Sequence, residues 1–438
     1  MRQNEIDVIT LGCSKNLVDS ERLMQQLKLS GFTVRHNPTR VSGKVVVVNT
    51  CGFIGDAKEE SINMILKMIA AKQRHQIGCI FVMGCLIERY RTELQQELPE
   101  VDAFYGKFDW PQLISDLGHV WHDTATQSRL IATPSHYAYL KIAEGCNRKC
   151  SYCAIPLITG RYVSRPMNDI VSEAEQLAAN GVKELLLIAQ DLTYYGRDTH
   201  HHSMLAQLLQ RLARIDGIVW IRLHYAYPHH FPLDALDVMR NEPKICPYLD
   251  MALQHISDHM LTLMRRQITK KETLNLIEKI RAEVPGIHLR TTLLVGHPEE
   301  TEADFEELQE FVRDMRFERL GAFAYSHEDG TYAYQHYSDN VPQTVKLQRL
   351  DTIMSIQEQI ANELNAQKVG QILRVMIDRR ENNFYVGRTQ FDSPDVDGEV
   401  LIDRDSCNKL HIGQFYQVLI KKAETFDLFG TIAENQTL

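Results

Sequence analysis

The chain is organised around a run with three cysteines in eight residues, Glu144-Gly145-Cys146-Asn147-Arg148-Lys149-Cys150-Ser151-Tyr152-Cys153. Thiolates at the spacing C-x3-C-x2-C repel one another unless a metal takes up their charge, and runs of this kind bind iron–sulfur clusters. Structural zinc needs four ligands, usually in two separated pairs, and the sequence has no second C-x2-C. Three ordinary loop thiols are the alternative, but reduced proteins seldom place three cysteines in one turn for packing. We therefore predict that Cys146, Cys150 and Cys153 bind a four-iron cluster, which leaves one iron open for a substrate or cofactor.

Length and composition are those of a soluble globular protein of two or three domains. The chain has 438 residues, of which 44% are hydrophobic and 24% charged, and a net charge of −9. That charge argues against a general affinity for nucleic acid phosphates. No export signal opens the chain, no apolar run reaches the roughly 18 residues of a membrane helix, and the nine cysteines are an odd number. We therefore expect a cytoplasmic protein with no membrane partner.

Residues 1–125 alternate between strand and helix patterns. Three short apolar runs predict strands, at 6–11, 45–48 and 80–83. Two stretches with apolar residues at helical spacing predict helices, at 20–29 and 59–71. This alternation is typical of a parallel sheet with helices on its faces, in which ligands bind at the carboxyl ends of the strands.

Cys13, Cys51 and Cys85 each follow one of these strands. Parallel strands bring their carboxyl ends to one edge of the sheet, so the three thiols are expected to converge in space. The glycine beside each cysteine lets the backbone approach a bound group closely. The pattern predicts a second three-thiolate cluster, although three buried core thiols would give the same pattern.

The other three cysteines are predicted to be packing residues. Cys79 lies at the start of the strand that ends at Cys85, roughly 20 Å away along an extended chain. Cys246 and Cys407 have no partner at ligand spacing.

From residue 137 onward, strand and helix patterns alternate six times. The predicted strands are 137–144, 183–190, 218–225, 248–255, 287–296 and 319–326. Helical patterns lie at 168–180, 203–215, 233–241, 257–283, 301–314 and 342–366. This alternation is typical of a partial (β/α) barrel with six units, whose active site lies at the carboxyl ends of its strands.

The last seventy residues change to short strands separated by turn residues. The predicted strands are 371–377, 384–388, 399–402, 415–421 and 428–432. Five such strands suggest a small antiparallel barrel similar to oligonucleotide-binding folds. The fold class is therefore α/β, with an amino-terminal parallel domain, a (β/α)6 barrel and a carboxyl-terminal five-stranded β-barrel.

The cysteine run resembles the signature of the radical S-adenosylmethionine (SAM) enzymes. The resemblance implies that the triplet holds a 4Fe–4S cluster and that SAM chelates its fourth iron. It also implies that Tyr152, before the last cysteine, lies near the adenine of SAM. Gln190, Gln254 and Arg290 belong to strands of the barrel and are the expected SAM contacts, although each is as well suited to capping a helix or fixing a loop.

Over essentially its whole length the chain is similar to the methylthiotransferase family, which joins an amino-terminal cluster domain, a radical SAM core and a TRAM domain. The boundaries expected here are 1–125, 132–366 and 368–438. The family binds a second 4Fe–4S cluster through cysteines in contexts matched by Leu11-Gly12-Cys13-Ser14-Lys15-Asn16, Asn49-Thr50-Cys51-Gly52-Phe53-Ile54 and Met83-Gly84-Cys85. No catalytic side chain is implied beyond the six cluster ligands.

Several stretches resemble the RimO-type branch, which adds a methylthio group to the β-carbon of an aspartate in small-subunit ribosomal protein S-twelve. They are Cys13-Ser14-Lys15-Asn16-Leu17-Val18-Asp19-Ser20, Ala189-Gln190-Asp191, Leu253-Gln254-His255 and Gly387-Arg388-Thr389-Gln390-Phe391-Asp392-Ser393-Pro394-Asp395-Val396-Asp397-Gly398. Residues 370–438 hold 8 Lys+Arg and 11 Asp+Glu, a balance that favours a basic protein partner over tRNA. One departure is Thr159, where relatives often carry arginine.

Two other functions fit the sequence less well. One is methylthiolation of an adenosine in tRNA, the reaction of the other branch of the family. The more remote one is a non-enzymatic iron–sulfur regulator that binds RNA. The reaction implied by the RimO-type resemblance begins when the SAM cluster passes an electron to SAM, which yields a 5′-deoxyadenosyl radical. That radical takes a hydrogen atom from carbon, and the second cluster delivers sulfur, so an electron donor and a sulfur source are further expected partners.

Overall fold

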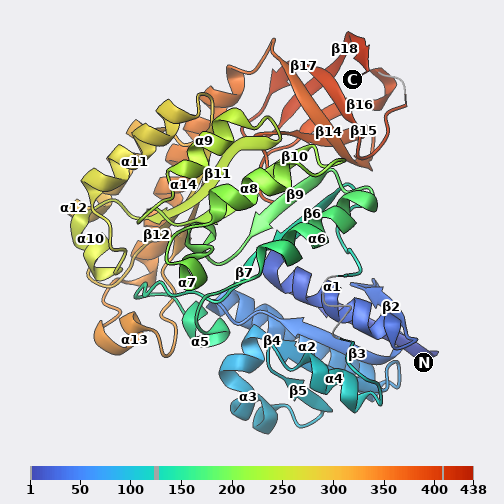
Figure 1. Ribbon diagram of the computed structural model, residues 1–438. Coiled ribbons are helices and arrows are strands. Elements are labelled where there is room, and N and C mark those ends of the chain that lie inside the picture. Colours follow the sequence, from blue (N-terminus) through green and yellow to red (C-terminus); the bar gives the residue numbers. More distant parts are fainter. Residues whose placement is uncertain (1, 123–127, 407–408, 438) are drawn as a thin grey trace.

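The computed structural model describes residues 2–122, 128–406 and 409–437. Cys407, predicted to be a packing residue, lies outside these residues. Three bodies follow one another along the chain (Figure 1). An amino-terminal sheet domain, drawn in blue, lies against a central six-stranded sheet, and a small red barrel covers the opposite end of that sheet.

The first body is a five-stranded parallel sheet in the order β2-β1-β3-β4-β5. Its strands are β1 (Arg2–Thr10), β2 (Thr33–His36), β3 (Gly43–Thr50), β4 (Cys79–Gly84) and β5 (Ala103–Tyr105). The predicted count of three strands was wrong, because β2 and β5 have only four and three residues, too few for an apolar pattern to show.

Helices cover both faces of this sheet. They are α1 (Ser14–Leu29), α2 (Gly55–Gln73), α3 (Cys85–Glu97) and α4 (Trp110–Asp116). Leu23 of α1 and Leu113 of α4 share one apolar core, whereas Ile65 of α2 and Leu94 of α3 share the other. Both strand faces are therefore buried, which explains the unbroken valine run of β3. Cys79 begins β4 and packs at the edge of the first core, as predicted.

The central body is a six-stranded parallel sheet in the order β13-β12-β11-β10-β9-β6. Its strands are β6 (Tyr137–Lys141), β9 (Glu184–Ile188), β10 (Trp220–Ala226), β11 (Ile245–Gln254), β12 (His288–Val295) and β13 (Arg319–Ala324). Its larger helices are α6 (Met167–Ala179), α8 (Leu205–Ala213), α9 (Asp234–Asn241), α11 (Lys270–Glu283), α12 (Glu302–Met315) and α14 (Gln343–Ala366). All six predicted strands are confirmed within a few residues.

Shorter elements lie around the carboxyl ends of these strands. They are the hairpin β7 (Ala143–Glu144) with β8 (Val163–Ser164), the helices α5 (Ile155–Thr159), α7 (Arg197–His200), α10 (Asp258–Leu263) and α13 (Tyr332–His336), and the 3-10 turn η2 (Leu192–Tyr194). The single helix predicted at 257–283 was wrong. The chain breaks between α10 and α11 through left-handed residues at Arg265 and Gln267, and Thr269 then caps the start of α11.

The third body is a closed five-stranded barrel, as predicted. Its strands are β14 (Ile372–Glu381), β15 (Phe384–Thr389), β16 (Val400–Asp403), β17 (Phe415–Ala423) and β18 (Leu428–Thr437), and the turn η3 (Arg404–Ser406) follows β16. Four strand pairs are antiparallel, but β16 pairs with β18 in parallel. The expectation of a wholly antiparallel barrel was therefore wrong at this one pair, where the barrel closes.

This small barrel covers the amino ends of the central strands. Phe415 of β17 packs edge-on against Trp220, the first residue of β10, with 4.8 Å between ring centroids. Cys246 is buried in the same apolar cluster, as predicted. Beside it, the buried carboxylate of Glu184 accepts a hydrogen bond from Arg222 Nε at 2.9 Å and pairs with Arg388 Nη2 at 2.6 Å. The carboxyl ends of the strands are left to face the first body.

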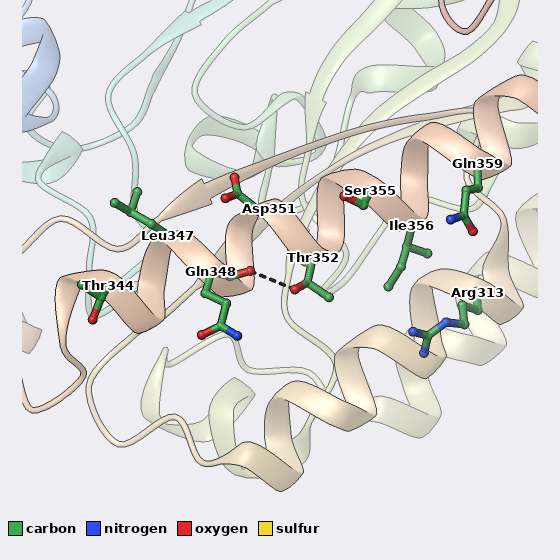
Figure 2. Close-up of a pocket in the computed structure, with 9 residues that line it drawn as sticks. All are labelled: Arg313, Thr344, Leu347, Gln348, Asp351, Thr352, Ser355, Ile356 and Gln359. Carbon is green, nitrogen blue, oxygen red and sulfur yellow. Dashed lines mark hydrogen bonds between the residues drawn. The ribbon is translucent and has the colours of Figure 1, made fainter.

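An open groove runs along the outer surface between α12 and α14 (Figure 2). Arg313 lies on its α12 side and Leu347 and Gln359 on its α14 side, and no predicted ligand lines it. Among the described residues, no helix combines the length and the hydropathy needed to cross a bilayer.

Candidate active site

The loop with the central cysteine triplet connects β7 to α5. Gly145 begins it with φ +79, and a Cβ there would stand 2.0 Å from the Arg161 carbonyl oxygen, so only glycine fits. Cys146 N donates to Gly160 O at 3.1 Å, and Cys153 N donates to Cys150 O at 3.2 Å. These contacts curl the loop so that its three thiols share one pocket.

That pocket has a volume of about 380 Å³ and includes all three predicted cluster ligands. Four cationic side chains line it as well, Arg148, Lys149, Arg161 and Arg265. Cations suit the negative charge of a thiolate-bound cluster and of a carboxylate ligand.

Arg266 makes the main side-chain contact to the cysteine triplet, and this contact was not predicted from the sequence. Its Nη1 donates to Cys150 Sγ at 3.3 Å and to the Tyr152 hydroxyl at 3.1 Å. The Tyr227 hydroxyl, in turn, donates to Arg266 O at 2.9 Å. Arg266 reaches this position because the chain breaks between α10 and α11. An interruption of the helical pattern at 264–269 was the one signal available in the sequence.

A buried ion pair orders the same loop from the β9 side. Arg148 Nε lies 2.8 Å from Asp191 Oδ2, and Asp191 also accepts a hydrogen bond from Thr193 N at 2.9 Å. Asp191, three positions beyond the end of β9, therefore holds the cysteine loop against the end of that strand.

The other three predicted ligands meet at the carboxyl edge of the first sheet, as expected from its parallel topology. A Cβ on Gly12 would stand 2.9 Å from Cys51 Sγ, so the Cys13 loop lies directly on Cys51. The thiol of Cys85 lies 3.4 Å from Asn16 Oδ1. Cys13 is exposed, whereas Cys51 and Cys85 are buried.

The two cysteine sets lie close to each other. Cys85 packs against Ala154 and Ile158, which follow directly after the central triplet. The interface between the first and central bodies therefore places both sets around one region, although they come from sequence segments about 60 residues or more apart.

The donor chemistry of both sets fits iron–sulfur clusters. Within the described residues, no three His, Cys, Asp or Glu side chains are close enough to hold a single metal ion. A four-iron cluster binds each cysteine through a different iron, so its ligands stand wider apart than those of one ion. Burial raises the pKa of Cys85 and of Cys146 to about 12. Iron must therefore displace a proton from each thiol when it binds.

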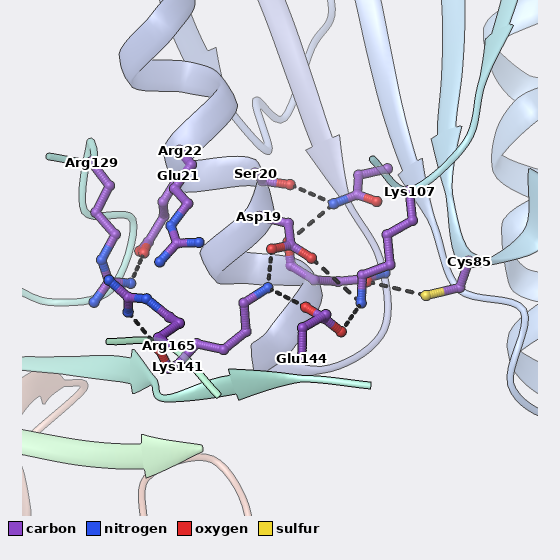
Figure 3. Close-up of polar contacts among 12 residues, drawn as sticks. Asp19, Ser20, Glu21, Arg22, Cys85, Lys107, Arg129, Lys141, Glu144 and Arg165 are labelled. Carbon is purple, nitrogen blue, oxygen red and sulfur yellow. Dashed lines mark hydrogen bonds and ion pairs between the residues drawn. The ribbon is translucent and has the colours of Figure 1, made fainter. Parts of the chain in front are cut away.

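A network of three buried charges and the partly exposed Glu144 joins the two bodies near Cys85 (Figure 3). Lys107 Nζ lies 2.8 Å from Glu144 Oε1 and 3.7 Å from Asp19 Oδ2. Lys141 contacts the same two carboxylates. Burial would lower the pKa of Lys107, but the attraction of Asp19 and Glu144 outweighs it and raises that pKa. The charges of the two lysines therefore balance those of the two carboxylates.

Beside this network, Figure 3 also shows Arg129 and Arg165 at the same interface. Arg129 Nη1 pairs with Glu21 at 2.5 Å, and Arg129 Nε and Arg165 Nη2 both contact Glu173, at 2.9 and 2.6 Å. Glu21 belongs to the first body and Glu173 to the second, so these arginines extend the ionic contact between them.

The predicted SAM contacts lie in different surroundings. Tyr152 is beside Arg266 in the cysteine loop. Gln190 lies past the end of β9, where its Nε2 donates to Glu144 Oε1 at 2.8 Å and its buried Oε1 has no partner among the described residues. An acceptor left free in this way suits the amino group of SAM. Gln254 ends β11 with φ +73.

Arg290 lies nearer the other end of the sheet, at the third residue of β12. Its guanidinium is 3.4 Å from Asp250 Oδ2 and 3.4 Å from Asp397 Oδ1. Asp397 belongs to the segment between β15 and β16, which also reaches Tyr248 through a hydrogen bond of 2.8 Å. These ion pairs occupy Arg290, and its contact with SAM stays a prediction.

Comparison with known proteins identifies each body. Residues 140–312 match the model of the radical SAM superfamily, residues 369–433 that of the TRAM domain, and residues 5–106 that of Uncharacterized protein family UPF0004. The solved structure of the radical SAM methyltransferase TsrM from Kitasatospora setae, with tryptophan and a SAM analogue bound, has a TM-score of 0.55 at 16% identity and covers 73% of each chain. It shares the fold of this chain.

Relatives of the same length are far more similar. The ribosomal protein uS12 methylthiotransferase RimO of Parabacteroides distasonis is 61% identical over 99% of this chain and 100% of its own. The protein of the same description from Bacteroides thetaiotaomicron is 58% identical over 99% of each chain. The predicted resemblance is confirmed: this chain belongs to the RimO family of radical SAM methylthiotransferases.

Proposed function

We propose that this chain attaches a methylthio group to the β-carbon of an aspartate in ribosomal protein uS12. Relatives named as ribosomal protein uS12 methylthiotransferases match 99% of this chain. The observation that carries the proposal is the position of the two cysteine triplets, which lie on either side of one interface.

We assign one SAM-binding 4Fe–4S cluster to Cys146, Cys150 and Cys153, and a second 4Fe–4S cluster to Cys13, Cys51 and Cys85. These bound groups supply one-electron chemistry and sulfur transfer, which no amino acid side chain provides. Around them, Arg266 donates a hydrogen bond to Cys150 Sγ, and Gly145 lets the loop close on the pocket.

The division of labour follows the three bodies. We propose residues 1–125 as the sulfur-delivering domain, 132–366 as the SAM-binding core and 368–438 as the TRAM domain. Tyr152, Gln190, Gln254 and Arg290 remain the proposed SAM contacts. An electron donor and a sulfur source are required partners, and the proposed ribosomal substrate implies a cytoplasmic location.

Separate variants of the two triplets test this assignment. Iron-reconstituted chain is incubated with SAM, a reductant and purified uS12, and both 5′-deoxyadenosine and methylthiolated uS12 are measured. Cys146→Ala is expected to abolish both products. Cys13→Ala is expected to keep some SAM cleavage but to lose methylthiolation. Equal loss of both products in the Cys13 variant would contradict two separate roles, and wild-type chain that leaves uS12 unmodified would contradict the substrate.

A further inference from the structure

Lys15 connects the second cysteine set to the mouth of the central sheet. It lies in the first turn of α1, two residues after Cys13, and is half-buried. Its ammonium stands 3.3 Å from the centroid of the Tyr225 ring, and Tyr225 is the penultimate residue of β10. A side chain of the first body therefore reaches the carboxyl end of a central strand, where a substrate must enter.

Lys15 carries a charge that no nearby carboxylate neutralises. Among the described residues, no Asp or Glu lies within ion-pair distance of its ammonium, and its influence on the buried Asp250 acts from further away. The other lysines with ion pairs at this interface are bound to carboxylates: Lys107 and Lys141 to Asp19 and Glu144, and Lys58 to Glu328.

The arginines nearby are bound as well. Arg148 pairs with Asp191, and Arg290 pairs with Asp250 and Asp397. Lys149, Arg161 and Arg265 line the pocket assigned to the SAM cluster. Lys15 thus differs from its neighbours at the interface in having an available charge outside that pocket.

The strand ends beneath Lys15 have an unusual backbone conformation. Tyr225 has φ +65 and Gln254, at the end of the adjacent strand β11, has φ +73. Non-glycine residues adopt this conformation at a cost, and such residues gather where a site is built. The aromatic face attracts the ammonium without accepting its conventional hydrogen bonds, so the N–H groups of Lys15 stay available to an incoming anion.

An acidic substrate loses hydration when it enters this interface. A carboxylate that leaves water needs a counter-charge or hydrogen-bond donors to replace its lost solvation. In aspartate, the β-carbon is bonded directly to the side-chain carboxyl carbon, so holding the carboxylate also positions the β-carbon.

We propose that Lys15 binds the side-chain carboxylate of the substrate aspartate and places its β-carbon between the two cysteine triplets. This assignment rests on the proposed function, and it makes Lys15 the residue that distinguishes aspartate from an uncharged side chain.

The test compares the binding of two forms of one substrate. Iron-loaded chain without reductant, so that no turnover occurs, is titrated with uS12 and with uS12 whose target aspartate is replaced by asparagine. Wild-type chain is expected to prefer the aspartate form by about tenfold to a hundredfold, the range for a hydrogen bond between charged groups. Lys15→Met is expected to reduce this preference to about twofold or less, and Lys15→Arg to keep most of it.

Matched measurements separate the proposed role from a structural one. Lys28→Met removes an exposed lysine from the other end of α1 and is expected to leave the preference unchanged. Iron per chain is measured for every variant and is expected to equal that of wild type. If Lys15→Met keeps the wild-type preference, or loses iron from the second cysteine set, substrate binding by Lys15 is overturned.

Failure of the proposed function itself has a different result. In that case wild-type chain would bind neither form of uS12 and, after addition of SAM and reductant, would modify neither. Methylthiolation of the aspartate form by wild type, together with an unchanged preference in Lys15→Met, would leave the function intact and reject only the role of Lys15.

Discussion

Replacing Lys107 by methionine tests whether the charge network near Cys85 holds the first and central bodies together. Lys107 is 3% exposed, and its partners Asp19 and Glu144 are 2% and 19% exposed. Methionine has a similar length and keeps most of the apolar contacts, so the change removes chiefly the charge. The network then holds one lysine against two carboxylates.

The magnitude follows from that imbalance. Removing one partner of a buried ionic network leaves an uncompensated charge and costs about 3 to 5 kcal/mol. A surface ion pair is worth less than about 1 kcal/mol. Lys72 and Asp102 form such a pair, 2.7 Å apart with side chains 28% and 33% exposed, so Lys72→Met is the matched control.

Urea-induced unfolding measures the effect. Lys107→Met is expected to lower the free energy of unfolding by about 3 to 5 kcal/mol, and Lys72→Met by less than about 1 kcal/mol. The double variant Lys107→Met with Asp19→Asn restores a balanced pair of Lys141 and Glu144, and should be more stable than Lys107→Met alone by at least about 1 kcal/mol. A loss below about 1 kcal/mol in Lys107→Met, or a double variant less stable than the single one, would show that charge balance in this network does not stabilise the fold.

Three further predictions concern pH and burial. Burial raises the pKa of Cys85 and Cys146 to about 12, so iron must displace a proton from each thiol. In a chelator competition between pH 6 and 9, the apparent iron affinity should therefore rise by roughly tenfold per pH unit for each displaced proton. An iron affinity that does not depend on pH would contradict this prediction. Burial also lowers the pKa of His297 to about 4, so its contribution to stability is present above pH 6.5 and is lost as pH falls toward 4. Wild type should lose about 2 kcal/mol more than His297→Gln between pH 7 and pH 5 in urea unfolding, and equal losses would show that His297 has no such effect. Glu184→Gln leaves two buried guanidinium groups facing each other and should cost about 3 to 5 kcal/mol, whereas a loss under 1 kcal/mol would mean that the TRAM barrel is not held there by charge.

The long-range order of the fold was predictable because it depends on repeated local patterns. Strand and helix alternation identified the parallel topology, and that topology alone brought Cys13, Cys51 and Cys85 to one edge. The short strands β2 and β5 could not be predicted, because three or four residues are too few to show a hydrophobic period. The parallel pairing of β16 with β18 could not be predicted either, because the direction of a strand in a closed barrel depends on the path of the chain rather than on residue type.

The side chains around the cysteines were harder to predict. Arg266, Lys107 and Lys15 each act through partners far away in the sequence, so no spacing rule points to them. Arg266 also depends on a helix break, for which the interruption of the helical pattern at 264–269 is the one signal in the sequence. The ion pairs of Arg290 were equally unpredictable, because Asp250 and Asp397 lie on other strands and segments of the folded chain.

Mass spectrometry of ribosomal protein uS12 from cells with and without this gene shows whether uS12 is the substrate. A methylthio group is expected on one aspartate of uS12 when the gene is present, and an unmodified aspartate when it is absent. The same mass of uS12 in both strains, with a methylthio group that depends on the gene found on adenosines of tRNA, would contradict the proposed substrate.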